Sequence, residues 1–255
     1  MSETSLVDRI ICAAARAWQN DGEVLATGIG IVPRLAASLC MSTLNRDLMM
    51  TDSEAWLVSE PVPVGPRAAQ AVKRETWMGF SRIFENVWGG KRHAMVGPTQ
   101  IDCFGQANIS MVGADYRQPK VQMLGVRGFP GNSISHANSF FVPQHSRKVF
   151  VEGEVDMVAS VGYNPARLPR GYSFDEIDIR CVVTNLCVMD FGGPDRQLRL
   201  RALHPGVSVQ DVQDATGFPV HVPDDIAETA PPREEELDVL ARLDPRNLRA
   251  AALGA

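Results

Sequence analysis

The sequence predicts an α/β protein whose open, largely parallel sheet is flanked by helices. Short apolar segments alternate along the chain with amphipathic segments of helical period, which is the pattern of strands joined by helical crossovers. Glycine-bearing loops follow several of these strands, as they do at the strand ends of α/β sheets. With 255 residues and 45% hydrophobic content, the chain is long enough to bury a substantial core.

The first elements follow from apolar spacing and turn residues. Apolar residues recur every three or four positions over residues 6–19, which predicts an amphipathic helix. Residues 23–27 form a short apolar run that predicts a buried strand, and the tight loop GIGIVP at 28–33 follows it. A second helix is predicted over 34–41, beginning near Pro33.

The later elements are predicted in the same way. A helix is expected over 75–87 because Gly89 and Gly90 suit a helix end, and an amphipathic helix is expected over 234–243. The Pro- and Gly-rich segment 60–66 is expected to be irregular. Strands are expected at residues 48–51, 93–96, 121–126, 149–151, 157–161 and 177–183. No internal repeat or long linker interrupts the chain, so we expect a single domain over 1–255.

Charge and hydropathy exclude several classes of partner. The formal net charge is -5 and the pI is near 5.6, and no basic stripe interleaved with aromatic residues exists to neutralise a phosphate backbone. Apolar runs stay well below the roughly 20 residues that span a bilayer, and the N-terminus lacks the basic-then-apolar order of a secretory signal. We therefore expect no nucleic-acid or membrane partner and a cytoplasmic location.

The five cysteines point to the core rather than to disulfides or metal. They are odd in number, widely scattered and mostly inside apolar stretches, which is typical of reduced core residues. Their spacing lacks a Cys-x-x-Cys pair or a histidine cluster. No metal site is expected.

Three glycine loops are the candidate ligand sites. They lie at 28–30, 97–105 and 125–131, each after a predicted strand. The first lacks the third glycine of a dinucleotide fingerprint, and no Lys-Ser or Lys-Thr pair completes a phosphate-binding loop. Taken singly, each loop is equally compatible with an ordinary tight turn.

In combination, the motifs resemble the β subunit of class I CoA-transferases, in the glutaconate CoA-transferase branch. The resemblance runs in order from about Val24 to Phe218. It rests on GIGIVP at 28–33, VGPTQIDCFGQAN at 96–108, Pro130-Gly131, HSRKVFV at 145–151, VTNLCVMDF at 183–191 and LHPGVSV at 203–209. It implies the CoA-transferase fold and a homologous α subunit, paired as α2β2. Coenzyme A would enter as part of the substrate, with no other cofactor.

The family's nucleophile position is altered in this chain. Transferases of the family carry a β-subunit glutamate there, which attacks the thioester. The matching stretch, LMMTDSEAW at 48–56, places Asp52 nearest that position and Glu54 where the family has glycine. An aspartate loses about 1.5 Å of reach, and a misplacement of that order costs roughly a hundredfold in rate. No catalytic residue is therefore assigned to this chain.

One branch of the family departs from the glutamate motif in this way, and the chain resembles it closely, including Trp56 and the Arg127 loop. This is the steroid-ring-degradation CoA-transferase-like hydrolase, and the resemblance implies retro-Claisen hydrolysis that opens a cyclic β-keto-enoyl-CoA from sterol rings C and D in cholesterol catabolism. The α subunit would supply the catalytic carboxylate. The alternatives are a CoA-transferase that uses Asp52 or Glu54, and a non-catalytic structural subunit.

Five residues are candidates for substrate binding. The guanidinium of Arg127, between two glycines, suits a carboxylate or an oxygen beside the thioester, and a salt bridge at the surface or at a subunit interface is the alternative. The amides at Gly28 and Gly30 suit an oxyanion, with a simple turn as the alternative. Asn132 and Ser133 follow the Pro-Gly pair and are placed to contact the thioester.

Five further polar residues are expected to hold the scaffold together. His145 and His204 are expected to satisfy polar groups in the core or at turns. Gln100, Asp102 and Asn108 are expected to brace the 97–105 loop through hydrogen bonds to its backbone.

Overall fold

The structure is a computed structural model that describes residues 5–66, 72–168 and 170–254. It falls into two compact units. The first unit comprises the chain up to Val96 together with the residues from Ala230 onward, and the second runs from Gly97 to Thr229.

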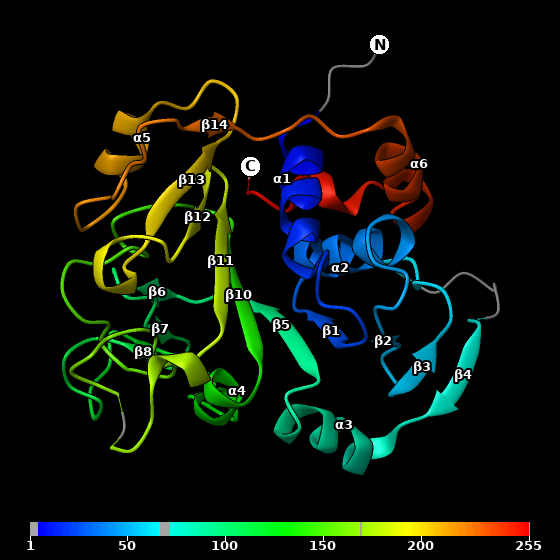
Figure 1. Cartoon of the computed structure of the whole chain (residues 1–255), viewed down its shortest axis with the longest axis horizontal. Helices are drawn as coiled ribbons and strands as arrows, with labels where there is room; N and C mark the ends of the chain where they lie inside the picture. The colour runs from blue at the N-terminus through cyan, green and yellow to red at the C-terminus, as the bar shows by residue number, and fades with distance from the viewer. Residues whose placement is uncertain (1–4, 67–71, 169, 255) are drawn as a thin grey trace. The chain divides into compact units, whose positions relative to one another are not determined.

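The first unit is a helical layer on a small sheet. Its elements are α1 (Leu6–Ala15), β1 (Leu25–Gly28), α2 (Ile31–Thr43), β2 (Met50–Thr51), β3 (Trp56–Val58), β4 (Arg74–Trp77), α3 (Gly79–Trp88), β5 (Arg92–Val96) and α6 (Glu234–Leu243). Strands β1 and β5 pair in parallel, whereas β2, β3 and β4 form a separate antiparallel sheet. Helix α2 packs on β1, and α1 and α6 pack on α2 (Figure 1).

Local sequence explains where the principal helices of this unit begin. Ser5 caps α1 by accepting a hydrogen bond from the Asp8 amide, and the apolar face that the sequence predicted is buried. Helix α2 begins at Ile31, three residues earlier than predicted, because Pro33 is tolerated within a first helical turn. Helix α6 has the predicted bounds, and the Glu236 carboxylate accepts a hydrogen bond from the Arg233 amide at its start.

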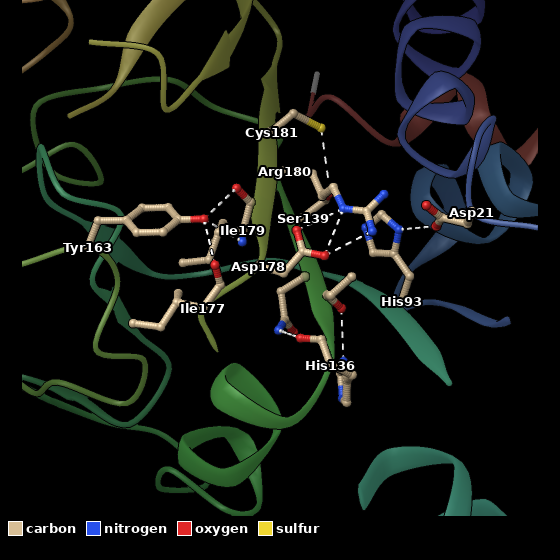
Figure 2. Close-up of polar contacts among 12 residues, drawn as sticks. Asp21, His93, His136, Ser139, Tyr163, Ile177, Asp178, Ile179, Arg180 and Cys181 are labelled. Atoms are coloured by element: carbon tan, nitrogen blue, oxygen red, sulfur yellow. Dashed lines mark hydrogen bonds and ion pairs between the residues drawn. The ribbon is translucent and has the colours of Figure 1, made fainter. Parts of the chain in front are cut away.

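A buried polar group ties the helical layer to β5. Trp18 is fully buried, and its indole donates to the backbone oxygen of His93 at 3.1 Å. The imidazole of His93 lies 2.6 Å from a carboxylate oxygen of Asp21, and both side chains are buried (Figure 2). This interaction fixes the connection between the first helix and β1 against the strand that pairs with β1.

The second unit is built around a mixed sheet. Its elements are β6 (Gln100–Ile101), β7 (Ala107–Asn108), β8 (Met111–Val112), β9 (Val121–Gln122), α4 (Phe129–Ser135), β10 (Ala137–Val142), β11 (Ile179–Thr184), β12 (Cys187–Asp190), β13 (Arg199–Leu203), α5 (Val209–Asp214) and β14 (Ala227–Glu228). Strands β10 and β11 pair in parallel, as do β13 and β14. Strand β12 runs antiparallel to both β11 and β13.

The core of the second unit is held by buried polar contacts as well as by apolar packing. All six residues of β10 are buried. The hydroxyl of Tyr163 accepts from the Ile179 amide at 2.9 Å and lies 3.1 Å from the Ile177 oxygen, so it fastens a loop to the start of β11 (Figure 2). Burial is the largest influence on Tyr163 and raises the pKa of its phenol. The side chain is therefore a neutral anchor.

The scaffold residues behave as the sequence predicted. His145 is buried, stacks on Phe150 and contacts the hydroxyls of Thr184 and Thr216. Burial lowers the pKa of His145 to about 4, so the ring is neutral at physiological pH. His204 lies 3.0 Å from the Thr184 backbone oxygen.

The 97–105 loop is braced from within, as predicted. One carboxylate oxygen of Asp102 accepts from the amides of Phe104 and Gln106. The Asn108 amide group donates to Gln100 at 2.7 Å and to the Met111 backbone oxygen at 2.6 Å. The polar residues of this motif therefore shape the loop.

The α/β class with a largely parallel sheet is confirmed, but several predicted elements are wrong. Residues 75–87 do not form one helix, because Arg74–Trp77 pairs with β3 as strand β4 and α3 begins at Gly79, whose φ of 61° breaks the chain direction. Residues 149–151 and 157–161 are not strands, since each is joined only by an isolated bridge. The strand predicted at 121–126 ends at Gln122.

The cysteines and the helices bear on two general expectations. All five cysteines are free, and all but the half-buried Cys103 are buried, as expected of core residues. In the part of the chain that is described, the helices are too short or too polar to cross a membrane.

Candidate substrate-binding loops

The first candidate loop joins β1 to α2 and requires glycine on steric grounds. A Cβ atom at Gly28 would lie 2.2 Å from the backbone oxygen of Pro33, which no real side chain tolerates. Gly30 precedes α2 with a φ of 99°, a conformation that L side chains rarely adopt. The two glycines therefore let the backbone of the loop pass close to the first turn of α2. The first amides of this helix have no partner within the helix.

Two exposed side chains flank this loop. Ile29 is 56% exposed and Ile31 is 38% exposed. A ligand at the loop would meet helix amides next to apolar surface, which suits an oxyanion carried by an apolar molecule.

The second feature of this unit is the hairpin that carries Asp52. Strand β2 ends at Thr51, and the side chain of Asp52 then turns back over the loop that leads to β3. One of its carboxylate oxygens accepts from the Glu54 amide at 2.8 Å and from the Trp56 amide at 3.1 Å. The side chain is 1% exposed, so this buried carboxylate stabilises the turn between β2 and β3 through its hydrogen bonds to the backbone.

Arg74, on β4, occupies the other oxygen of Asp52. Its Nε donates at 2.8 Å, and its Nη2 lies 2.8 Å from the same oxygen and 2.6 Å from a carboxylate oxygen of Glu54. The guanidinium also lies over the Trp56 ring, 5.5 Å from its centroid. Arg74 therefore links both acidic residues of the hairpin to β4.

The ionisation of Asp52 follows from these contacts. Burial acts to raise the pKa of Asp52, but the amides of Glu54 and Trp56 and the guanidinium of Arg74 together lower it below the usual value. The carboxylate is thus anionic at physiological pH, yet each of its oxygens already accepts hydrogen bonds. Attack on a thioester would require these bonds to break.

Arg34 connects the glycine loop to the hairpin. It lies in the first turns of α2 and donates to the backbone oxygen of Thr51 at 3.0 Å. Burial lowers the pKa of Arg34, and the nearby charge of Asp52 opposes that effect. The structure therefore brings Gly28, Gly30 and Asp52 together within one unit.

The third feature, in the second unit, is the loop that carries Arg127. Arg127 has a φ of 52°, an uncommon left-handed conformation for a residue with a side chain, and Gly125 two residues earlier has a φ of 84°. The side chain is exposed. Within the described ranges it has no hydrogen-bond or ion-pair partner in this chain, so the alternative of a salt bridge on this chain's own surface gains no support.

Asn132 and Ser133 lie in α4, and the Pro130-Gly131 pair that they follow belongs to the same helix. The Ser133 hydroxyl is buried and donates to the Pro130 oxygen at 2.9 Å, so it serves the helix. The backbone oxygen of Asn132 accepts from the Asn138 side chain. A shallow, mostly apolar pocket of about 400 Å³ lies beside this helix, lined by Pro130, Gly131, Ser133, Ile134, Val158, Ala159, Val161 and Arg167.

Sequence reasoning missed two features of these loops. Arg74 lies just before the helix expected over 75–87 and was given no role, and nothing in its charged surroundings marks it as the partner of Asp52, 22 residues earlier. The buried Asp102 carboxyl was expected only to brace its loop. Burial raises the pKa of Asp102 to about 7, against opposing hydrogen bonds from Gln106 and Phe104.

The described residues contain no group of three or more His, Cys, Asp or Glu side chains arranged to hold a metal ion.

The fold is that of the CoA-transferase family. The crystal structure of glutaconate coenzyme A-transferase from Acidaminococcus fermentans aligns with a TM-score of 0.79 at 22% identity, covering 97% of both chains, which concerns the fold alone. No protein-family model matches the chain.

Proteins with higher sequence identity identify a smaller family within this class. The cholesterol ring-cleaving hydrolase IpdB subunit of Mycobacterium tuberculosis is 40% identical over 242 residues, or 94% of this chain and 95% of that protein. The crystal structure of Rhodococcus jostii RHA1 IpdAB aligns with a TM-score of 0.91 at 37% identity over the full length of both chains. The chain belongs to the family of cholesterol ring-cleaving hydrolase IpdB subunits, which confirms the resemblance predicted from its motifs.

Proposed function

We propose that this chain is one subunit of a hydrolase that opens a steroid ring carried as a coenzyme A thioester in cholesterol catabolism. The name of its relatives, cholesterol ring-cleaving hydrolase, supports this activity. The proposed substrate is a cyclic β-keto-enoyl-CoA derived from sterol rings C and D. Coenzyme A is part of the substrate, and no cofactor enters the reaction.

One observation carries the proposal beyond family membership. The carboxylate at the family's nucleophile position, Asp52, is buried and engaged by the amides of Glu54 and Trp56 and by Arg74. A side chain held in this way is a poor nucleophile, because forming an acyl bond would leave two amides and a guanidinium without their acceptor. This favours hydrolysis over covalent transfer of CoA.

The chemistry requires a base and a site for an oxyanion. Water adds to the ring ketone, and its proton passes to a carboxylate that we assign to the partner subunit. The resulting alkoxide collapses, the ring carbon–carbon bond breaks, and the thioester stabilises the departing carbanion until it is protonated. The products are a new carboxylate and an intact CoA thioester.

We assign binding roles to the loops of this chain. The exposed guanidinium of Arg127 binds a substrate carboxylate or an oxygen beside the thioester. The amides that follow Gly28 and Gly30 stabilise the developing negative charge. Asn132 lies beside the thioester, whereas the hydroxyl of Ser133 shapes the helix that carries Asn132.

The working enzyme in this proposal contains a homologous α subunit in an α2β2 assembly. The relatives are named as subunits, and the Rhodococcus jostii structure is that of IpdAB. We place the enzyme in the cytoplasm, where the buried free thiols of this chain stay reduced.

The deciding experiment follows oxygen and CoA together. The coexpressed complex is given a ring-C/D keto-acyl-CoA in H₂¹⁸O, with a free carboxylic acid present as a possible CoA acceptor. Ring opening predicts one ¹⁸O atom in the new carboxylate and a retained CoA thioester. An intact ring together with CoA on the added acid would show that the enzyme is a transferase.

Chemical trapping addresses the nucleophile directly. Hydroxylamine or borohydride treatment during turnover should leave Asp52 and Glu54 unmodified. A non-catalytic role for this chain predicts that Arg127→Ala leaves substrate affinity and turnover unchanged.

A further inference from the structure

Helix α3 exposes an aromatic face that the proposed reaction does not use. Phe80, Phe84 and Trp88 follow one another at intervals of four residues and therefore lie on one side of the helix. They are 82%, 52% and 67% exposed, and Trp77, at the end of β4, is 58% exposed. We call these four side chains the aromatic face.

The aromatic face is large for an exposed surface. At roughly 200 Å² for each aromatic side chain, the exposed fractions correspond to roughly 500 Å² of apolar area. The largest apolar patch on a single chain is typically of about this size and is often functional. A standard interface buries about 800 Å² on each partner, so this face is large enough to form the apolar centre of one.

The helix itself gains little stability from its own chain. Of its ten residues, Gly79 and Val87 are buried. In Figure 1, α3 lies apart from α1, α2 and α6, the helices that form the packed layer of this unit. Isolated helices of this length are marginal in water, so a covering partner would stabilise α3 as well as bury its aromatic side chains.

The aromatic face is attached directly to the Asp52 hairpin. The Trp77 indole donates to the Glu54 backbone oxygen at 3.2 Å, and the Met78 amide donates to the Ala55 oxygen at 2.9 Å. A molecule bound to the aromatic face would therefore be positioned next to the loop that closes on Asp52.

Charge argues against a lipid surface as the occupant. The polar side of α3 carries Arg82 and Glu85, whose opposite charges cancel. Helices that lie on anionic membranes carry several Lys or Arg residues on their polar side. The polar side of α3 lacks such a cluster, and aromatic side chains are enriched at the centre of protein interfaces.

From the size of the face, the balanced charge on the polar side of α3 and the attachment of the face to the Asp52 hairpin, we infer that the aromatic face of α3 binds the partner subunit. This inference rests on the proposed function, which requires a second chain to complete the site beside that hairpin. Docking would bury Phe80 and Trp88, order α3 and hold the Asp52 hairpin against the shared site.

The test measures assembly rather than activity. Phe80→Ser and Trp88→Ser are combined in the coexpressed complex, because both side chains are largely exposed and their loss should leave the fold of this chain intact. Serial dilution followed by mass photometry gives the dissociation constant between the two subunits. We expect that constant to rise at least about a hundredfold, as truncation of two central aromatic residues does at other interfaces.

Two further variants separate docking from helix stability. Arg82→Ser with Glu85→Ser changes the same helix on its polar side and should leave the dissociation constant within a few-fold of the wild-type value. Phe80→Leu with Trp88→Phe keeps the face apolar and should restore most of the affinity.

Three results would overturn the inference. The first is an unchanged dissociation constant for the serine variant. The second is loss of self-association between copies of this chain while the partner stays bound, which would make the face a contact between identical chains. The third is loss of binding to phosphatidylcholine vesicles with subunit assembly intact, which would make it a lipid contact.

The experiments distinguish failure of the proposed function from failure of the docking inference. If the serine variant loses its partner while the wild-type complex assembles but does not open the ring, the docking inference stands and only the reaction is wrong. If ring opening is observed and assembly is insensitive to the aromatic face, the reaction stands and the docking inference is wrong.

Discussion

Asp52→Ala tests whether the buried carboxylate of the β2–β3 hairpin holds the fold or reacts with substrate. Removing it takes the acceptor away from the amides of Glu54 and Trp56 and from the guanidinium of Arg74. Hydrogen bonds to charged groups contribute about 1.5–3 kcal/mol each, whereas a pair with an Arg74 side chain that is 32% exposed adds about 1 kcal/mol or less. Since water can reach part of the opened turn, we expect a loss of about 3 kcal/mol.

The assay is thermal unfolding of the coexpressed complex, with ring-opening kinetics measured on the same samples. For a chain of this size, 3 kcal/mol corresponds to a fall in Tm of roughly 6–12 °C. Arg74→Ala should lower Tm by much less. The double variant should be little worse than Asp52→Ala alone, because the two side chains share one interaction.

The kinetic outcome distinguishes the two roles of Asp52. If the carboxylate is structural, kcat at a temperature well below Tm should fall by less than about tenfold in Asp52→Ala. Loss of a true nucleophile costs about 10⁴-fold or more. An Asp52→Ala complex with unchanged Tm and a kcat lowered to that extent would refute the reasoning.

The remaining predictions concern three loops. Gly28→Ala should cost at least about 3 kcal/mol in unfolding experiments, because its Cβ would lie 2.2 Å from the Pro33 backbone. Gly22→Ala has open space around the new Cβ and should cost only about 1–2 kcal/mol. Equal costs for the two variants would contradict the steric argument. Arg127→Gly should raise the free energy of unfolding by about 1 kcal/mol, because glycine adopts a positive φ without strain. The same variant should weaken substrate binding about 10- to 100-fold through loss of the guanidinium. A variant that is less stable but binds substrate normally would contradict both the strain and the binding role. The folded state holds a proton on Asp102 up to about pH 7, well above the ordinary pKa of 3.8, so it loses stability relative to the unfolded chain as the pH rises from about 4 to 7. Asp102→Asn should be as stable as wild type near pH 4 and more stable by up to about 4 kcal/mol above pH 7, and a difference in stability that does not vary with pH would exclude this origin.

Local pattern located α1, α2 and α6, but it missed α4 and α5 and began α3 too early. Helix α6 has the predicted bounds, and α1 differs from its prediction only at its end, because one-sided apolar spacing is visible along the chain. Strand β10 was missed because all its residues are buried and Asn138 and Ser139 interrupt any apolar run. The segment around Phe150 looked like a strand, but its backbone pairs with Ile101 through a single bridge.

The candidate site was predictable where backbone geometry decides and unpredictable where partners are distant. Gly28 and Gly30 could be identified from sequence because close approach and positive φ leave few alternatives to glycine. The contacts of Asp52 could not, because Arg74 reaches it through pairing between β3 and β4 that no local motif encodes. The exposure of the α3 aromatic residues was also not predictable from sequence, since a helical stripe of apolar side chains usually indicates a buried face.

The close approach of Gly28 to Pro33 has a consequence for how substrate preference evolves. The path of the backbone at this turn is fixed, so relatives cannot change the space for a ligand beside the turn by shifting the main chain. Ile29 and Ile31 project from the same turn and are not confined by the core. Selection for bulkier or smaller acyl groups should therefore act on these two positions, and exchanging them between homologous enzymes should transfer preference while leaving the turn unchanged.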